Sequence, residues 1–129
     1  MASRLGRFMK DDLPKRILDR RRAIRLYESL PFQIGHKGYE IQAVSINISS
    51  TGIYCLMDKD ISMMTKLDLC LFLPSAQKRK ARKIRVEGVV VRKQKDQVTE
   101  KFYVAIYFSK LKPADQKFLN EYIQRRLKK

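Results

Sequence analysis

Histidine and cysteine are scarce in this chain of 129 residues, which has one His and two Cys. A structural zinc site takes about four such ligands, so no zinc site is expected. Cys55 and Cys70 lie in apolar runs without metal-ligand spacing, which indicates small buried residues of a reducing cytoplasm. His36 has no acid or nucleophile near it, and Ser49 has no recognisable base partner. We therefore expect neither an enzyme nor a metalloprotein.

Long apolar runs and acidic residues are also in short supply. No run is long enough to span a bilayer, and residues 1–10 lack the apolar core of a signal peptide. These two absences predict a cytoplasmic protein. Only 13 Asp and Glu residues stand against 29 Lys and Arg, for a formal net charge of +16. This charge predicts an anionic partner, whether a nucleotide, a nucleic acid, an acidic protein or an anionic membrane.

The length fits one domain with its own core, and a hydrophobic content of 44% favours folding over disorder. Short strand-like runs separated by turn residues predict a mainly β domain, with strands at 26–34, 39–49, 53–57, 66–73, 83–93 and 101–109. Pro31 marks an edge or a bulge in the first strand. Strands of this number and spacing indicate a closed antiparallel barrel or a small sandwich.

The two ends of the chain differ in pattern. Pro113 suits the first position of a C-terminal helix, and Asp115 suits its first turn. An apolar stripe at helical spacing predicts that this helix closes one face or end of the barrel: Phe118, Leu119, Tyr122, Ile123 and Leu127. Residues 1–18 are expected to form a flexible or partly helical segment, and residues 19–129 the folded domain.

An arginine cluster stands directly ahead of the first predicted strand, at Arg20, Arg21, Arg22 and Arg25. Guanidinium groups are planar, permanently charged donor forks that suit phosphate and the acceptor edge of guanine. In so basic a chain the same spacing also arises by chance, and a solvated basic face is the alternative interpretation. Because Arg25 abuts the first strand, the loop that carries the cluster could fold over the outside of the barrel.

A second polar motif, Asn47-Ile48-Ser49-Ser50-Thr51-Gly52, ends the second predicted strand. Strand alternation predicts that Asn47 and Ser49 share one outward face, where both can touch a single ligand. The same alternation places Ser45 on that face and directs Val44, Ile46 and Ile48 to the core. Gly52 permits a turn that a residue with a Cβ would resist. An ordinary polar face that ends in a turn is the alternative.

The two motifs are one hairpin apart, so the fold could bring them together as a receptor site for a guanine-bearing phosphodiester. Here the chain resembles the PilZ domain, the bacterial receptor module for cyclic diguanylate (c-di-GMP). The matching motifs are Arg21-x-x-x-Arg25, with Arg20 directly ahead, and Asn47-x-Ser49-x-x-Gly52. The resemblance covers roughly residues 19–127 and includes the strand segments 52–54, 86–90 and 103–108. It implies a six-stranded antiparallel β-barrel with a C-terminal α-helix.

The resemblance also implies roles for the motif residues. Arg21 and Arg25 would grip phosphate and guanine, Asn47 and Ser49 would touch a guanine edge or the phosphodiester, and Gly52 would keep the turn open. In the family, an arginine in the place of Arg20 tends to accompany an intercalated ligand dimer, which implies two c-di-GMP molecules per chain and no other cofactor. Binding would order the N-terminal segment and so signal to an unidentified protein partner. The resemblance places such a receptor in second-messenger control of motility or biofilm formation.

Two positions depart from the family pattern. Many members have Asp in the place of Asn47, and Asn offers one acceptor oxygen where Asp offers two, so affinity could be lower. Ala105 stands where a glycine is frequent. Two other functions remain open at this point. One is a small basic barrel that binds nucleic acid through residues 78–83 and the basic C-terminus, and the other is a degenerate PilZ module that binds only proteins.

Overall fold

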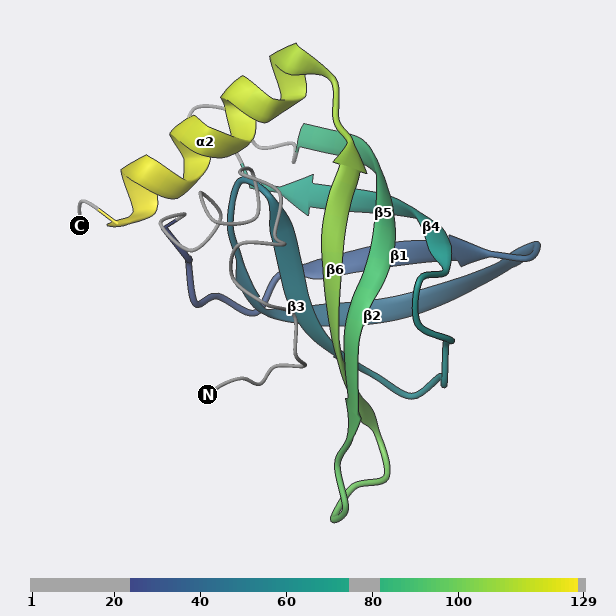
Figure 1. Ribbon diagram of the computed structural model, residues 1–129. Helices are drawn as coiled ribbons and strands as arrows, with labels where there is room; N and C mark the ends of the chain where they lie inside the picture. Colours follow the sequence, from purple (N-terminus) through teal and green to yellow (C-terminus); the bar gives the residue numbers. More distant parts are fainter. Residues whose placement is uncertain (1–23, 75–81, 128–129) are drawn as a thin grey trace, which may run out of the picture.

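The computed structural model describes residues 24–74 and 82–127. These residues form a closed antiparallel barrel with the strand order β1-β2-β3-β6-β5-β4 and one helix, α2 (Figure 1). The elements are β1 (Pro31–His36), β2 (Tyr39–Ile48), β3 (Gly52–Met57), β4 (Lys66–Leu73), β5 (Arg82–Lys95), β6 (Phe102–Lys110) and α2 (Pro113–Leu127). The expected six-stranded barrel with a C-terminal helix is confirmed. The predicted N-terminal segment 1–18 lies outside the described residues.

Strict alternation explains the barrel wall most clearly in β4. Leu67, Leu69, Leu71 and Leu73 are buried in the interior, whereas the alternate residues are exposed or partly buried: Lys66, Asp68, Cys70 and Phe72. Burial of each leucine side chain stabilises the fold by roughly 1.5–3 kcal/mol. Because β4 pairs with both β1 and β5, its leucines contribute to the contact that closes the barrel.

The first strand begins later than its sequence pattern suggested. β1 starts at Pro31, and the preceding residues contribute only an isolated bridge between Leu26 and Ile48. In this bridge the Leu26 amide donates to the Ile48 carbonyl at 2.8 Å, and the Ile48 amide donates to the Leu26 carbonyl at 3.0 Å. Proline has no amide hydrogen for a ladder, so it fits the first residue of a strand. The expectation of a continuous strand over 26–34 is therefore wrong.

A β-bulge in β2 changes which side chains point inward. Ser45 pairs with Cys55 and Asn47 pairs with Tyr54, so Ile46 is an extra residue on the β2 side. Val44 is 47% exposed, and Ser45, at 1%, is buried. The expectation that Val44 faces the core and Ser45 faces water is wrong. Ile48 is buried as expected. The extra residue at the bulge shifts the alternation by one position, so that Ile48 again points inward.

Helix α2 lies across one end of the barrel (Figure 1). Leu119, Tyr122 and Ile123 are buried in the same core cluster as the strand residues, so the helix closes the barrel as the apolar stripe predicted. Of the two further members of the stripe, Phe118 is partly buried against the core and Leu127 is exposed. In the described part of the chain, no helix is both long and apolar enough to cross a membrane.

Candidate ligand-binding site

The arginine motif and the asparagine motif meet on the outer side of β2. Arg25 Nη1 donates a hydrogen bond of 2.9 Å to Asn47 Oδ1, across 22 residues of sequence. The bridge between Leu26 and Ile48 causes this meeting, because it lays the residues before β1 alongside the end of β2. Arg25 remains exposed, whereas only 7% of the Asn47 surface is accessible. The contact therefore presents a cationic donor beside an amide held in place.

Arg20 and Arg21 lie outside the described residues. Their roles stay predictions from the sequence. Arg25 is the one motif arginine within the described ranges, and its guanidinium has donors beyond the one that Asn47 accepts.

Ser49 is fully buried within the turn between β2 and β3. Its amide donates to the Gly52 carbonyl at 2.9 Å, and its hydroxyl accepts from the Thr51 amide at 3.2 Å. The hydroxyl also lies 3.3 Å from Thr51 Oγ1. Ser49 therefore shapes the turn that follows Asn47, and the expectation that its side chain faces water is wrong. Its contact with a ligand stays a prediction from the sequence.

Gly52 is required for a different reason from the one its turn suggested. Its backbone is not among the described residues with a left-handed φ, so no turn conformation demands glycine here. A Cβ at Gly52 would instead lie 2.7 Å from the Ile106 carbonyl oxygen of β6. β6 also holds the turn directly, because the Phe108 amide donates to the Thr51 carbonyl at 2.8 Å. Gly52 thus sets how closely the motif turn packs against β6.

The outer surface beside Asn47 continues across three more strands. Asn47 pairs with Tyr54, Tyr54 with Ala105, and Ala105 with Arg92. Tyr54 stacks on Tyr103, with ring centroids 6.0 Å apart and planes at 14°. Burial raises the pKa of the Tyr54 phenol, as does Tyr103, whereas the nearby charge of Arg92 lowers that pKa. Sequence reasoning singled out Asn47 and Ala105 and missed Tyr54 and Arg92, although these two occupy outward positions of predicted strands.

A second contact joins the residues before β1 to helix α2. Tyr122 Oη donates to Glu28 Oε1 at 3.2 Å, and Arg126 Nη2 donates to Tyr122 Oη at 3.0 Å. Arg126 Nε also lies 3.3 Å from Glu28 Oε2. Glu28 follows Arg25 by three positions, so this segment contacts β2 at one point and the helix at the next. No local sequence pattern indicates that Glu28 meets a residue 94 positions away.

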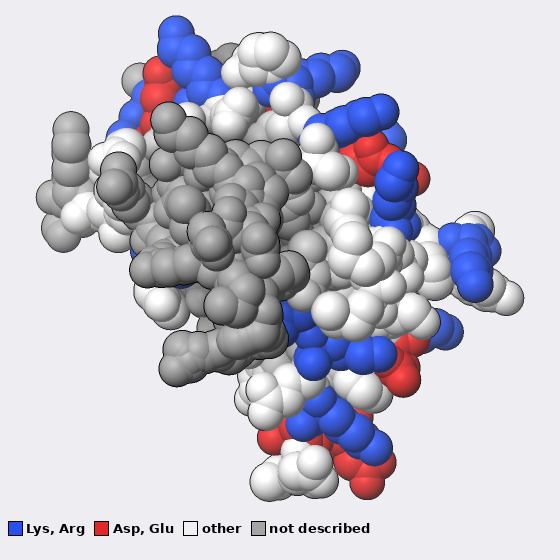
Figure 2. Space-filling view, in the orientation of Figure 1, with Lys and Arg blue, Asp and Glu red and all other residues white. Residues whose placement is uncertain are grey.

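The rival basic patch, residues 78–83, lies largely outside the described residues. Its described members have partners: Arg82 pairs with Asp115 at 3.1 Å and lies over the Phe118 ring, and Lys83 lies over Phe72. Arg82 therefore helps to hold the start of α2. On the face in Figure 2, basic side chains lie in several separate groups with acidic ones among them. Across residues 24–74 and 82–127, no group of His, Cys, Asp and Glu could hold a metal ion.

A separate hollow of about 480 Å³ lies mainly over β1, β4 and β5, away from Arg25 and Asn47. Its charged lining comprises Glu40, Asp68, Glu87, Lys83 and Arg85. The carboxylates outnumber the cations there, so an anionic ligand is disfavoured in this hollow.

Comparison with known proteins gives two kinds of match. The sequence profile of the PilZ domain matches residues 19–125. The structure is similar to the Bacillus subtilis inhibitor of motility (MotI/DgrA), with a TM-score of 0.73 and 30% identity over 81% of this chain and 50% of that one. The chain thus spans half the length of that protein.

It is also similar to the PilZ domain with c-di-GMP of YcgR from Escherichia coli, with a TM-score of 0.60. That match covers 84% of this chain and 95% of the other at 15% identity, which shows a shared fold. No curated protein sequence matches the chain.

Proposed function

Because this chain belongs to the PilZ domain family, we propose that it is a non-enzymatic cytoplasmic receptor for c-di-GMP. The observation that carries the proposal is the 2.9 Å hydrogen bond between Arg25 and Asn47. This bond joins one residue from each of the two motifs, at a place where the charge of Arg25 remains exposed. The YcgR domain, whose fold is similar, holds c-di-GMP in its own structure.

The chemistry of these residues suits a guanine dinucleotide. Guanine presents O6 and N7 acceptors that a guanidinium can engage with two hydrogen bonds, and phosphate oxygens accept from the same group. Asn47 adds an amide beside Arg25 that can both donate and accept. Each desolvated charged hydrogen bond contributes roughly 1.5–3 kcal/mol. A few of them give about −8 kcal/mol, which corresponds to micromolar affinity.

Signalling would pass through the segment that carries the arginines. Binding through Arg21 and Arg25 would order the N-terminal segment against the barrel and present a changed surface to a protein partner. The Glu28 contacts with Tyr122 and Arg126 give this segment a connection to helix α2. Arg20 supports a stoichiometry of two ligand molecules per chain.

Isothermal titration of the protein with c-di-GMP at moderate salt tests the proposal, with GTP and a short DNA duplex as controls. We expect saturable binding at micromolar or lower concentration, no binding of GTP, and a stoichiometry near two. A stoichiometry near one would refute the paired ligand alone. Binding of DNA without c-di-GMP would favour the nucleic-acid alternative, and neutral substitutions within residues 78–83 should then weaken it. No binding of any of these ligands would favour a module that binds only proteins.

Arg21→Ala and Arg25→Ala locate the site. Each removes charged hydrogen bonds, so each should weaken c-di-GMP binding by roughly tenfold to a hundredfold. Circular dichroism should show that the barrel remains folded in Arg25→Ala, since the exposed Arg25 side chain does not belong to the core. Unchanged affinity in both variants would exclude the Arg-x-x-x-Arg site.

A further inference from the structure

The hollow of about 480 Å³ over β1, β4 and β5 has an opening at Gly35, which lines it without a side chain. Gly35 pairs with Glu40 of β2 on one side and with Asp68 of β4 on the other. Its φ is not among the left-handed values of the described residues, and an added Cβ would have no atom of a non-adjacent residue nearer than 3.7 Å. Glycine within a strand weakens that strand, and it often marks a place where a ligand or another chain approaches closely. The opening is therefore a feature that the backbone of β1 does not itself require.

Three carboxylates lie in one cross-strand row at this opening. The row runs from Glu40 through Gly35 and Asp68 to Glu87, since each residue pairs with the next. The side chains of Glu40 and Asp68 make no ion pair or hydrogen bond with any residue of 24–74 or 82–127. Glu87 has the exposed Lys110 as its partner at 3.7 Å, but it also lies directly opposite Asp68, which is an unfavourable like-charge pair. Glu40 and Asp68 thus remain available to an external cation.

Two cations occupy another corner of the same hollow. Lys83 and Arg85 are successive outward residues of β5, and both line the hollow. Arg85 pairs with Cys70, so Asp68 is its diagonal neighbour across the two strands. The guanidinium of Arg85 is nevertheless exposed, and it makes no ion pair or hydrogen bond within the same described ranges. The hollow therefore presents free charges of both signs.

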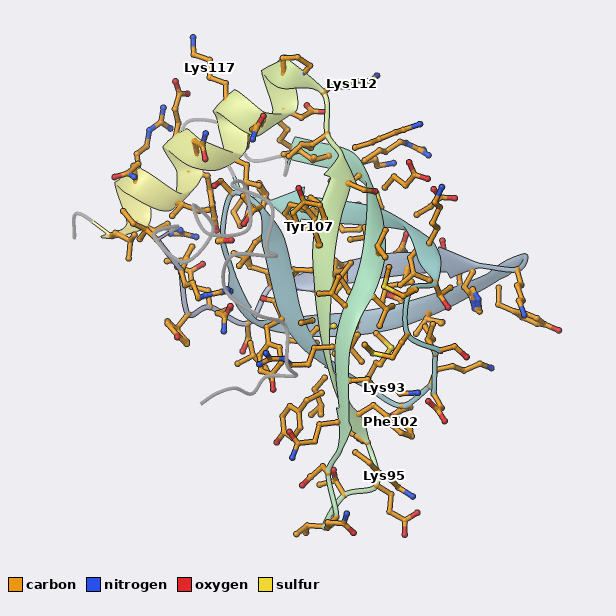
Figure 3. The ribbon with its side chains drawn as sticks, in the orientation of Figure 1. Lys93, Lys95, Phe102, Tyr107, Lys112 and Lys117 are labelled. Atoms are coloured by element: carbon orange, nitrogen blue, oxygen red, sulfur yellow. The ribbon has the colours of Figure 1, made fainter. Side chains whose placement is uncertain are left out.

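The β5–β6 hairpin shows the contrary arrangement, because its charges are paired within the protein. Lys93 pairs with Asp60 and lies beside Phe102 (Figure 3), and Lys101 pairs with Asp58. At the hollow, unpaired charges coincide with a glycine inside a strand and with a like-charge pair. Departures from the rules of stable folding that gather at one place are typical of a functional site. The charges there favour an occupant that itself carries both signs.

We propose that the hollow is a docking site for an extended segment of a partner protein, which carries a basic residue and, about four residues along, an acidic one. The basic side chain lies over Gly35 between the carboxylates of Glu40 and Asp68, and the acidic side chain meets Arg85. Two strand spacings and two residues along a strand separate Gly35 from Arg85 by roughly 12 Å, and four residues of an extended chain cover about 13 Å. The Gln33 amide, which also lines the hollow, can donate to and accept from the backbone of that segment. This inference goes beyond the proposed function and does not depend on c-di-GMP.

Fluorescence anisotropy with the full-length protein tests the docking site. The probe is a short labelled threonine-rich peptide that carries one arginine and one glutamate about four residues apart. Asp68→Asn and Gly35→Leu should each weaken its binding by about tenfold, the first by removing a carboxylate and the second by filling the opening. Glu121→Gln is the matched control, because it removes an exposed carboxylate of α2 outside the hollow, and it should change binding by less than about twofold. Alkylation of Cys70, which lines the hollow, should slow when the probe is bound.

Four results would overturn the docking site and leave the receptor function standing. One is no binding of the probe, or equal affinity of Asp68→Asn and Glu121→Gln for it. Another is undiminished binding of a peptide in which alanine replaces either the arginine or the glutamate. A third is displacement of the probe by c-di-GMP, which would place the peptide at Arg25 instead. The last is Cys70 that reacts faster when the free protein is diluted, because a second copy of the chain would then fill the hollow.

Urea denaturation curves show whether Gly35→Leu remains folded, and Asp68→Asn keeps the test independent of that variant. Absence of c-di-GMP binding by the wild-type protein, with the probe still bound, would overturn the receptor function alone.

Discussion

Two sides of the same barrel differ in shape and in charge. The side that carries Arg25, Asn47 and Arg92 has guanidinium groups and tyrosines without a carboxylate in the row. The other side carries the hollow of about 480 Å³, where Glu40, Asp68 and Glu87 outnumber the two cations. The hollow is therefore the more acidic of these two surfaces, although the chain as a whole is strongly basic.

This difference favours the side of Arg25 and Asn47 over the hollow as the proposed site for an anionic ligand, because of its charge. Two like charges 6 Å apart repel by about 3 kcal/mol at an effective dielectric constant near 20. A dinucleotide with two phosphates would meet that repulsion at the hollow and the opposite at Arg25. The predictions below test whether the two sides are as distinct as this contrast requires.

The largest effect should come from alanine substitutions of one glycine on each side. In Gly52→Ala the new Cβ meets the Ile106 carbonyl at 2.7 Å, and a backbone atom cannot swing away. We expect a loss of about 1–3 kcal/mol in the free energy of unfolding. In Gly35→Ala the nearest atoms stand 3.7 Å away, and the smaller entropy of the unfolded chain should stabilise the fold by about 0.4–1 kcal/mol. Urea denaturation measures both, and equal effects would contradict the close approach of β6.

A smaller effect should follow from Asn47→Asp on the side that carries the proposed site. A carboxylate accepts from both N1–H and N2–H of guanine, whereas the amide has one acceptor oxygen. One additional hydrogen bond of about 1 kcal/mol should tighten c-di-GMP binding by roughly fivefold in a titration. Asn47→Ala is the control and should bind more weakly than wild type. Weaker binding by Asn47→Asp would mean that its pairing with Arg25 outcompetes the ligand.

On the hollow side, Asp68→Asn should have a slight stabilising effect. Asp68 lies directly opposite Glu87 on the neighbouring strand, and like charges in that arrangement are unfavourable. We expect a gain of a few tenths of a kcal/mol that disappears at high salt. Urea midpoints at low and high salt measure it, with c-di-GMP affinity as the second readout. A change of affinity beyond about twofold would show that the two sides are electrically coupled.

The smallest effect concerns the two thiols. Cys55 is buried inside the barrel, where desolvation raises the pKa of its thiol to about 12, whereas half-buried Cys70 lines the hollow. An alkylating reagent near pH 8 should therefore label Cys70 first, because the thiolate is the reactive form. Saturating c-di-GMP should leave the labelling rate of Cys70 unchanged. Protection of Cys70 by the ligand would place c-di-GMP in the hollow and contradict the proposed site at Arg25 and Asn47.

The fold was predictable where alternation runs without interruption. Residues 66–73 read as one strand and form β4 with the same bounds, because every second residue is a leucine. The helix likewise begins at Pro113 as its pattern indicated. β2 was harder, since Val44, Ile46 and Ile48 read as one apolar face. The bulge at Ile46 arises from the pairing of β2 with β3, which periodicity does not encode.

The sequence by itself determined the number of strands, the closing helix, the family and the residues of the two motifs. Its information is local, because alternation and motif spacing concern neighbours along the chain. Only the tertiary structure decided that the carbonyl of Ile106 leaves no room for a Cβ at position 52 and that Arg25 lies against Asn47. It alone aligned Tyr54 and Arg92 with that pair. These relations depend on strand register and on the order of strands around the barrel, and both are set by packing between distant segments.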